Sequence, residues 1–509
     1  MQPETATIPL LLTIGQVCEK INLGRTTFYQ LRQSGGFAPT VHRLGGKLLV
    51  RADELTRWVE SGMPPARLWN AQQEYKPQKQ LNRPVAGGEI TFSLRGGQER
   101  MTTNKRGDSI FNPDTIAAAI MSSYIFDPEP KEMLNFQSTS KARWTLTNWC
   151  DDFYEWIAGK WDRIPNSEID LRIARHLQEH NEGGDVAFGH APKATISKSL
   201  VGNVRLCLAA RALRPATRTL NQWDNIEQDA RLTLSMRNGL LVLHKNDQEE
   251  LIPHTPDYFT FVQLPYDYDA TAECTLWQSF LRDVMMDRTE YILLLQQWCG
   301  YLLRPDLRLQ KFLLTVGEGA NGKTVFNEVV QSLLGIENCS QIPISRFDSP
   351  FALVGTRGKM LNVTTEGVGM IEEEAETTLK SFVSGDRMTF ERKFRDAVSD
   401  VPTAKIMVST NDLPRFNDKS QAIWRRILLV PFDKKITEKN QIDSLAEELK
   451  TELPGILRWS IDGLRSLNAA GRFTMPENSK TLLEQYRCDV NPARAFLLET
   501  MQRPTTATR

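Results

Sequence analysis

Residues 317–324 read Gly317-Glu318-Gly319-Ala320-Asn321-Gly322-Lys323-Thr324, and they follow the apolar run Phe312-Leu313-Leu314-Thr315-Val316. Residues 325–334 then have the pattern of a helix. Glycines let a chain curl so that successive N–H groups point at phosphate oxygens, and a helix N-terminus adds positive potential. Lys323 is placed to reach the β- and γ-phosphates, and Thr324 to hold Mg²⁺. This order of strand, loop and helix predicts a nucleoside triphosphate site, with ATP and Mg²⁺ as cofactors. The alternative is a glycine-rich turn without a ligand.

The overall composition indicates a modular globular protein. Its 509 residues suggest three or four domains at about 150 residues per domain. The formal net charge is zero, so any contact with nucleic acid must be local. Seven cysteines without a CxxC pair fit reduced thiols better than a zinc site. The sequence has no signal-peptide pattern and no apolar run of about 20 residues. We therefore expect a cytoplasmic protein without a membrane partner.

The first predicted domain covers residues 1–62 and has the plan of a winged helix-turn-helix. Its expected elements are two helices, two strands and a last helix, at 14–20, 25–33, 40–44, 47–50 and from about 53 to 62. Thr13 and Gln16 predict a capping box on the first helix. Gly45-Gly46 between the strands is a hairpin signal.

This domain resembles the excisionase and AlpA-type regulators over most of its length. The resemblance implies that its second helix enters the major groove of duplex DNA while the hairpin holds phosphates. The DNA-contacting residues implied in this way are Arg25, Thr26, Thr27, Tyr29 and Arg32 on the helix, and Lys47 and Arg51 on the hairpin. A protein-docking role for the same domain is the alternative.

Four further regions are predicted after this domain. They are a Gln-, Pro- and Gly-rich linker, a helical domain, an α/β P-loop ATPase core and a C-terminal helical region, at 63–95, 96–230, 231–435 and 436–509. The helical domain is expected to contain helices over 144–161, 168–179 and 195–213. In the ATPase core, strands are expected at 359–364, 405–409 and 427–430. The predicted fold class is therefore multidomain, with a parallel α/β core.

Polar residues at the ends of the predicted core strands are candidates for catalysis. Glu366 follows one strand and is placed to orient the attacking water or to act through Mg²⁺. Asn411 follows the next strand and is placed to sense the γ-phosphate. Arg425 and Arg426 are candidates for an arginine finger provided to a neighbouring subunit. The alternatives are that Glu366 is an exposed carboxylate, that Asn411 only forms a turn, and that the arginines belong to a surface ion pair.

Residues 230–490 resemble superfamily 3 helicases, which are AAA+-like, in the branch formed by phage, plasmid and satellite primase-helicases. The motifs behind the resemblance are Asn238-Gly239, Pro253-His254-Thr255-Pro256-Asp257, residues 317–324, Ser409-Thr410-Asn411 and Trp424-Arg425-Arg426. The resemblance implies that Lys323 and Thr324 form the Walker A pair, that Glu366 is the Walker B acid, and that Asn411 is the sensor. It further implies that Arg425 or Arg426 is the finger and that a hexameric ring moves 3′ to 5′ around DNA. The family tends to have a second acid near Glu366, whereas glycine follows here, so metal coordination by Glu366 stays open.

A basic and aromatic segment between Glu366 and Asn411 is a candidate for single-stranded DNA binding. Residues 390–395 read Phe-Glu-Arg-Lys-Phe-Arg, and such a segment suits a channel loop that grips phosphates and touches bases. It resembles the DNA-contacting hairpin of the same family, with Arg392, Lys393 and Phe394 near the tip. A solvated basic hairpin is the alternative. Residues 193–218 are also basic and suggest a DNA-facing collar, or an oligomerisation surface, in the helical domain.

These features predict an ATP-dependent replicative DNA helicase or initiator of a mobile genetic element, such as a phage, a phage satellite or a plasmid. The N-terminal domain would bring the homo-hexamer to an origin-like duplex site. Residues 1–230 lack the clustered acids and histidine of a primase, so a separate primase or a host replication protein is a candidate partner. His176 and His180 are one helical turn apart without a third ligand, which favours an exposed helix face. The alternatives are a site-specific regulator whose ATPase controls assembly without unwinding, and a DNA-packaging motor, which the motif order does not support.

Overall fold

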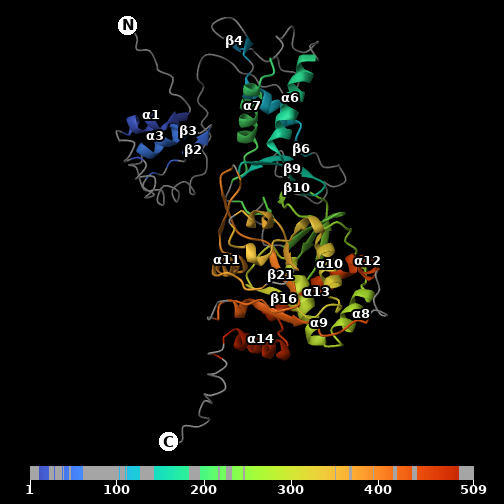
Figure 1. The fold of residues 1–509 in the computed structure, drawn as a ribbon. Coiled ribbons are helices and arrows are strands. Elements are labelled where there is room, and N and C mark those ends of the chain that lie inside the picture. Colours follow the sequence, from blue (N-terminus) through green and yellow to red (C-terminus); the bar gives the residue numbers. More distant parts are fainter. Residues whose placement is uncertain are drawn as a thin grey trace, which may run out of the picture. The chain divides into compact units, whose positions relative to one another are not determined.

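Figure 1 shows the computed structural model of the chain. It describes residues 11–21, 28, 37, 39, 41–44, 47–60, 102–103, 109–110, 112–126, 143–182, 195–215, 218–224, 232–244, 247–349, 351–365, 369–393, 395–416, 421–437, 444–491 and 494. The chain forms two compact units, Met1–Gly97 and Gln98–Arg509, and each is described by itself. No helix within the described ranges is both long enough and apolar enough to cross a bilayer.

The N-terminal unit contains the first helix, the two hairpin strands and the last helix that its sequence predicts, together with an additional strand, whereas the helix predicted at 25–33 lies largely outside the described residues. The described elements are β1 (Leu11–Thr13), α1 (Ile14–Lys20), β2 (Val41–Leu44), β3 (Lys47–Arg51) and α3 (Ala52–Glu60). The strands form an antiparallel sheet in the order β1-β3-β2, and the capping box of Thr13 and Gln16 is present. The Phe37 ring lies 4.9 Å from the rings of both Phe28 and Trp58, and these three rings form the centre of a small core.

The middle region combines helices with antiparallel strands. Its helices are α5 (Pro113–Ser122), α6 (Asn166–Glu182) and α7 (Lys198–Arg211), and its main sheet is β8 (Leu146–Trp149), β9 (Asp152–Ile157) and β10 (Lys160–Ile164). Two short strand pairs join β4 (Thr102–Thr103) to β5 (Ser109–Ile110) and β6 (Ile125–Phe126) to β7 (Arg143–Trp144). Apolar side chains from α5, α6 and α7 pack with those of the sheet in one core.

The prediction of a helix over 144–161 is wrong, because this segment forms the β8-β9-β10 sheet. Two tight turns connect its strands, at Cys150-Asp151 and at Ala158-Gly159. All four turn residues have positive φ, namely 51°, 64°, 49° and 102°, as two-residue hairpin turns of type I′ require. Aromatic and β-branched residues between the turns favour strands as well. The helical predictions for 168–179 and 195–213 are confirmed by α6 and α7.

A second group of antiparallel strands leads to the ATPase core. It contains β11 (Gln222–Trp223) paired with β15 (Tyr258–Phe259), and the sheet of β12 (Leu232–Met236), β13 (Gly239–Leu243) and β14 (Glu249–Ile252). Two helices follow, α8 (Thr275–Val284) and α9 (Thr289–Leu302). The Trp149 ring of β8 lies 5.3 Å from the Phe259 ring of β15. The middle region is thus joined to the core by aromatic packing.

The ATPase core is a parallel sheet with helices on both faces. Its strands are β16 (Phe312–Val316), β17 (Cys339–Ser340), β18 (Leu361–Thr364), β21 (Lys405–Thr410) and β22 (Ile427–Pro431), in the spatial order β17-β18-β21-β16-β22. Short 3-10 helices precede or connect these strands: η3 (Ile336–Asn338), η4 (Ile344–Arg346), η5 (Leu353–Thr356) and η6 (Trp424–Arg426). The predicted α/β core is confirmed.

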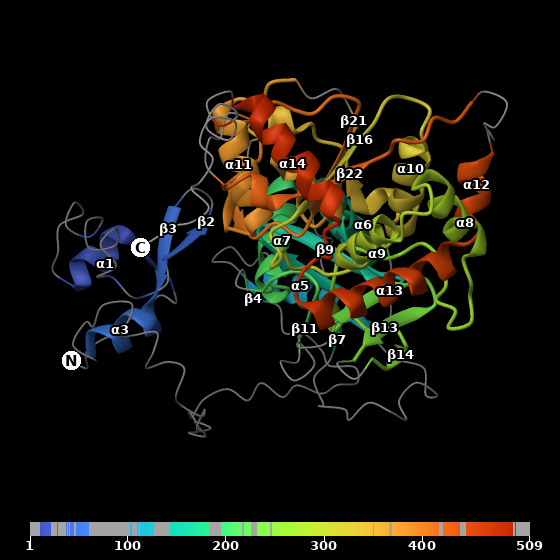
Figure 2. The same ribbon diagram turned by 90° about the horizontal axis from the view of Figure 1, so that it is seen from below.

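Alternating residues of the central strand enter two different hydrophobic cores. Leu313 lies in a core with side chains of α8, α9, α10 (Lys323–Leu334) and α13 (Leu453–Ala470), and α12 (Leu445–Lys450) contributes to the same core. Phe312 and Leu314 pack on the other face with α11 (Glu373–Ser384) and α14 (Glu477–Val490). Figure 2 shows α11 and α14 on one side of the strands and α8 and α10 on the other. Because the sheet is covered on both faces, its carboxyl edge is left for ligands, as in other open α/β sheets.

Candidate active site

The glycine-rich loop lies at the carboxyl end of the central strand β16. Val316 pairs with Thr410 of β21 on one side and with Pro431 of β22 on the other. The loop ends at Gly322, whose φ of 88° is left-handed, and α10 begins at Lys323. A Cβ atom on Gly322 would lie 2.7 Å from Val284 Cγ1, and one on Gly317 would lie 2.3 Å from the Phe432 carbonyl oxygen. Both positions therefore require glycine.

The Lys323 side chain is buried inside the loop and faces oxygen atoms. Its Nζ donates to the Gly317 carbonyl, to Asn321 Oδ1 at 3.2 Å and to Asn411 Oδ1 at 3.4 Å. These partners are neutral, and no described carboxylate pairs with it. Burial lowers the pKa of the Lys323 ammonium below its ordinary value. A partly desolvated cation in a cradle of backbone groups fits the phosphates of a nucleotide.

The structure brings two predicted site residues together at one edge of the sheet. Asn411 follows β21 and reaches Lys323, although the two are far apart in the sequence. Thr324 lies exposed in the first turn of α10, where its hydroxyl is available as one Mg²⁺ ligand. Glu366 lies outside the described residues. Its strand, β18, ends at Thr364, which pairs with Val408 of β21.

Sequence reasoning missed the segment after β22 that holds the loop in place. The Phe432 N–H donates to the Val316 carbonyl at 2.7 Å, and Asn321 Nδ2 donates to the Phe432 carbonyl at 3.1 Å. The Ile436 N–H donates to the Ala320 carbonyl at 2.8 Å. Lys435 forms an exposed ion pair with Glu318 at 2.6 Å. No local pattern in the sequence signals these contacts, because they join positions more than a hundred residues apart.

An open cleft beside the loop also escaped sequence reasoning. Its lining comes from the loop, from the end of β21, from the segment after β22 and from α14, including Gly317, Asn411, Lys434, Gln485 and Asp489. The cleft is continuous with the phosphate loop, so the sugar and base of a nucleotide can be placed there. Polar α14 side chains would then face the nucleoside.

The two candidate finger residues lie at the opposite end of the sheet. They belong to η6, which leads into β22, and Ile427 pairs with Phe312 at the start of β16. The strand separates them from the loop by roughly 13 Å, more than an arginine side chain spans. Arg426 is buried and donates to Ser384 Oγ at 2.6 Å and to the Ala422 carbonyl at 2.5 Å, whereas Arg425 is exposed. Neither arginine reaches the loop of its own chain.

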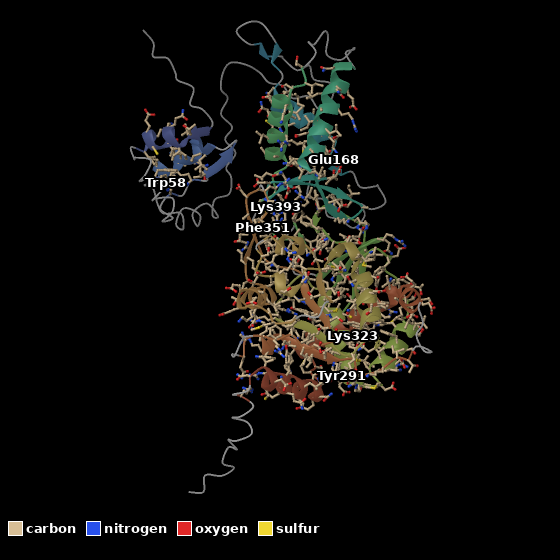
Figure 3. All side chains as sticks on the ribbon, viewed as in Figure 1. Trp58, Glu168, Tyr291, Lys323, Phe351 and Lys393 are labelled. Atoms are coloured by element: carbon tan, nitrogen blue, oxygen red, sulfur yellow. The ribbon has the colours of Figure 1, made fainter. Side chains whose placement is uncertain are left out.

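The basic segment at 390–395 forms the tip of a hairpin between β19 (Met388–Phe390) and β20 (Val398–Asp400). Lys393 is exposed there, and Phe394 lies outside the described residues. In Figure 3, Lys393 lies on the side of the ATPase core toward β9 and β10, far from Lys323. Arg392 differs from the prediction of a DNA-contacting residue. Its guanidinium binds the buried carboxylate of Asp152 at 2.6 Å and is therefore an internal anchor.

Other residues predicted to contact DNA are accounted for as follows. Arg25, Thr26, Thr27, Tyr29 and Arg32 lie outside the described residues, and Lys47 begins β3. Three of the six basic residues in the segment that suggested a collar surface are neutralised. Arg205, Arg211 and Arg214 form ion pairs with Asp170, Asp114 and Asp224 at 2.8, 2.8 and 2.5 Å. These pairs leave α7 with less free positive charge than its sequence suggests.

Comparisons with known proteins find matches to three separate parts of the chain. Residues 11–63 match the family described as helix-turn-helix domain, residues 139–286 match the family described as D5 N terminal like, and residues 315–426 match a family of unknown function, DUF5906. "Putative helicase 121R" of Invertebrate iridescent virus 3 is 22% identical over 313 residues, which are 53% of this chain and 32% of the viral protein. The chain thus spans about a third of that relative's length.

Two solved structures of the NrS-1 C-terminal region, both apo forms, are also similar. One is 10% identical with a TM-score of 0.41 and covers 74% of this chain and 75% of its own. The other is 11% identical with a TM-score of 0.42 and covers 73% and 75%. The family matches and the viral relative confirm the predicted resemblance to phage-type superfamily 3 helicases with an N-terminal helix-turn-helix domain.

Proposed function

We propose that this chain, a relative of the phage-type superfamily 3 helicases, is an ATP-dependent replicative DNA helicase of a mobile genetic element. The observation that carries the proposal is the position of Lys323, buried in a glycine-rich loop at the carboxyl end of β16 and in contact with Asn411. A triphosphate in this loop takes the place of the neutral oxygens around the Lys323 ammonium. The Thr324 hydroxyl would hold Mg²⁺, and the ion would supply Lewis-acid charge neutralisation.

The chain's own residues divide the work of hydrolysis. Lys323 holds the β- and γ-phosphates, and Asn411 is close enough to report the presence of the γ-phosphate through β21. Glu366 orients the attacking water. Arg425 stabilises the transition-state charge in a neighbouring subunit, because it lies too far from the loop of its own chain. The proposed assembly is therefore a ring, with six subunits as the resemblance implies.

The hairpin of β19 and β20 is the proposed contact with single-stranded DNA in the pore, and movement is proposed to run 3′ to 5′. The second strand of this hairpin, β20, leads into the amino end of β21, and Asn411 follows the carboxyl end of β21. A nucleotide-dependent shift at one end of β21 is thereby transmitted to the hairpin at the other. The N-terminal domain is proposed to bind an origin-like duplex site, and a separate primase or replication protein to supply primers.

The test is strand displacement on forked DNA together with ATP hydrolysis in the presence and absence of single-stranded DNA. Wild type should hydrolyse ATP faster with DNA and displace a strand. Lys323→Ala should do neither, and the exposed lysine variant Lys480→Ala should behave as wild type. Hydrolysis without any DNA stimulation would reject the motor. The helix-turn-helix match favours one other candidate, a regulator that binds a duplex site and uses ATP only for assembly, and this protein would displace no strand.

A further inference from the structure

Three arginine side chains converge on the single buried carboxylate of Asp152. Arg163 Nη2 lies 2.9 Å from Oδ1, Arg392 Nη1 lies 2.6 Å from Oδ2, and Arg395 Nη1 also contacts Oδ1. Asp152 is 3% exposed. The arginines come from two distant parts of the chain, one from β10 and two from the hairpin of β19 and β20. The carboxylate therefore clamps this hairpin to the middle region.

Local structure fixes the carboxylate in position. The left-handed turn at Cys150-Asp151 makes Asp152 the first residue of β9, and Arg163 lies on the adjacent strand β10. Arg392 also donates hydrogen bonds to two backbone carbonyls inside the protein, that of Asp396 at 3.1 Å and that of Cys150 at 3.3 Å. Its side chain is only 11% exposed. Arg392 is thus a structural part of the clamp.

A second contact holds the other strand of the hairpin. Arg357 Nε lies 2.9 Å from Asp400 Oδ2 at the end of β20, and the Arg357 guanidinium lies 4.4 Å from the centroid of the Trp149 ring of β8. Both strands of the hairpin are therefore attached to the β8-β9-β10 sheet. The hairpin and this sheet form one surface, and they do not move as separate parts without breaking buried ion pairs.

Arg163 and Arg395 keep most of their hydrogen-bonding capacity. Their side chains are 51% and 33% exposed, and each makes one hydrogen bond within the described part of the chain. A guanidinium has five N–H donors in a planar fork that matches a phosphate. Three guanidinium groups against one carboxylate leave positive charge on this surface, and exposed Lys393 lies beside it. The nearby acids Asp151 and Asp396 offset part of that charge without pairing with these two arginines.

We propose that Arg163 and Arg395, together with Lys393, bind phosphates of the single-stranded DNA, and that Asp152 is the positioning residue that aims both guanidinium groups. This inference rests on the proposed function. It extends the DNA contact from the hairpin of the ATPase core to β10 of the middle region. Arg163 is thereby a phosphate ligand from a part of the chain that carries no nucleotide-binding residue.

The experiment measures binding of a fluorescent oligothymidylate to the full-length protein by anisotropy, with a non-hydrolysable ATP analogue, over a series of salt concentrations. Arg163→Ala should weaken binding at fixed salt. It should also reduce the slope of log affinity against log salt by about 0.7, the value for one lost phosphate contact on a single strand. Arg175→Ala, which removes an exposed arginine from α6, is the matched control and should change neither quantity.

Comparing Asp152→Asn with Asp151→Asn distinguishes the positioning role of Asp152 from its effect on the net charge. Both variants remove one negative charge at neighbouring positions, but only Asp152 binds the arginines. Electrostatics alone makes each variant bind DNA more tightly. The clamp predicts that Asp152→Asn instead binds several-fold more weakly, whereas Asp151→Asn binds at least as well as wild type. Circular dichroism of both variants checks that they fold, and ATP hydrolysis without DNA should be unchanged in Asp151→Asn.

The outcomes separate this inference from the proposed function. Wild-type protein that binds no single-stranded DNA overturns both. Wild-type protein that binds DNA, with Arg163→Ala equal to it in affinity and in salt slope, overturns only the Arg163 contact. Tighter binding by Asp152→Asn overturns the positioning role of Asp152.

Discussion

Replacing Arg425 by alanine tests whether the nucleotide site is completed by a neighbouring subunit. Arg425 is exposed at the amino end of the sheet, roughly 13 Å along β16 from the loop, so it has no role at the site of its own chain. An arginine finger typically contributes a factor of about 10³ to 10⁵ to the rate of hydrolysis. At about 1.4 kcal/mol for each factor of ten, this is about 4 to 7 kcal/mol of transition-state stabilisation. Arg425→Ala should therefore fold normally and lose nearly all ATPase activity.

The adjacent arginine provides the matched control. Arg426 is buried and holds Ser384 and the Ala422 carbonyl, so Arg426→Ala removes two charge-assisted hydrogen bonds. At about 1.5 to 3 kcal/mol each, the loss is about 3 to 6 kcal/mol of unfolding free energy, visible as a lower melting temperature. Arg425→Ala should melt as wild type does.

Mixing experiments assay the trans arrangement directly. Lys323→Ala and Arg425→Ala subunits are each inactive alone, but a mixed assembly contains interfaces with an intact loop and an intact Arg425. Such mixtures should regain part of the ATPase activity, and wild-type activity per subunit should fall on dilution. An Arg425→Ala protein with wild-type activity, or mixtures that stay inactive at every ratio, would refute the reasoning.

The remaining predictions concern the loop and one buried lysine. Gly322→Ala should lose binding of a fluorescent ATP analogue, because its Cβ would collide with Val284 and its φ is left-handed. Gly319→Ala is the control, since a Cβ atom there has open space around it, and this variant should bind the analogue as wild type does. Equal affinity of the two variants would contradict the loop geometry. Burial lowers the pKa of Lys405 in the folded protein to about 7, whereas its ordinary value in the unfolded chain is 10.5. Between these two pH values the unfolded chain binds one proton more than the folded protein, so the unfolding free energy rises with pH. Lys405→Met should flatten this rise in chemical denaturation measured from pH 7 to 10, and an unchanged slope would contradict the assignment.

The sequence predicted the elements whose signals are local. Two features depend only on residues close together in the sequence, namely the capping box of Thr13 and Gln16 and the glycine-rich loop. For this reason α1 and the strand, loop and helix around Lys323 were predicted correctly. The end of β21 likewise placed Asn411 at the carboxyl edge of the sheet, since parallel strands end together there.

What the sequence did not predict has two physical causes, which are a local composition that fits either a helix or a strand and contact between distant parts of the chain. The aromatic segment from 144 to 161 fits a helix or a strand by composition, and only the left-handed turns at Cys150-Asp151 and Ala158-Gly159 decide for the sheet. The pairing of Arg392 with Asp152 joins residues 240 positions apart, so no local pattern distinguishes this anchor from a DNA ligand. The cleft beside α14 is formed in the same way.

The central claim is that ATP hydrolysis at Lys323 drives movement along DNA. The most direct measurement is strand displacement from a forked DNA substrate with ATP and Mg²⁺, comparing wild type with Lys323→Ala at equal protein concentration. The account predicts ATP-dependent displacement by wild type and none by the variant. Displacement by Lys323→Ala at the wild-type rate, or ATP hydrolysis by wild type without any displacement, would contradict it.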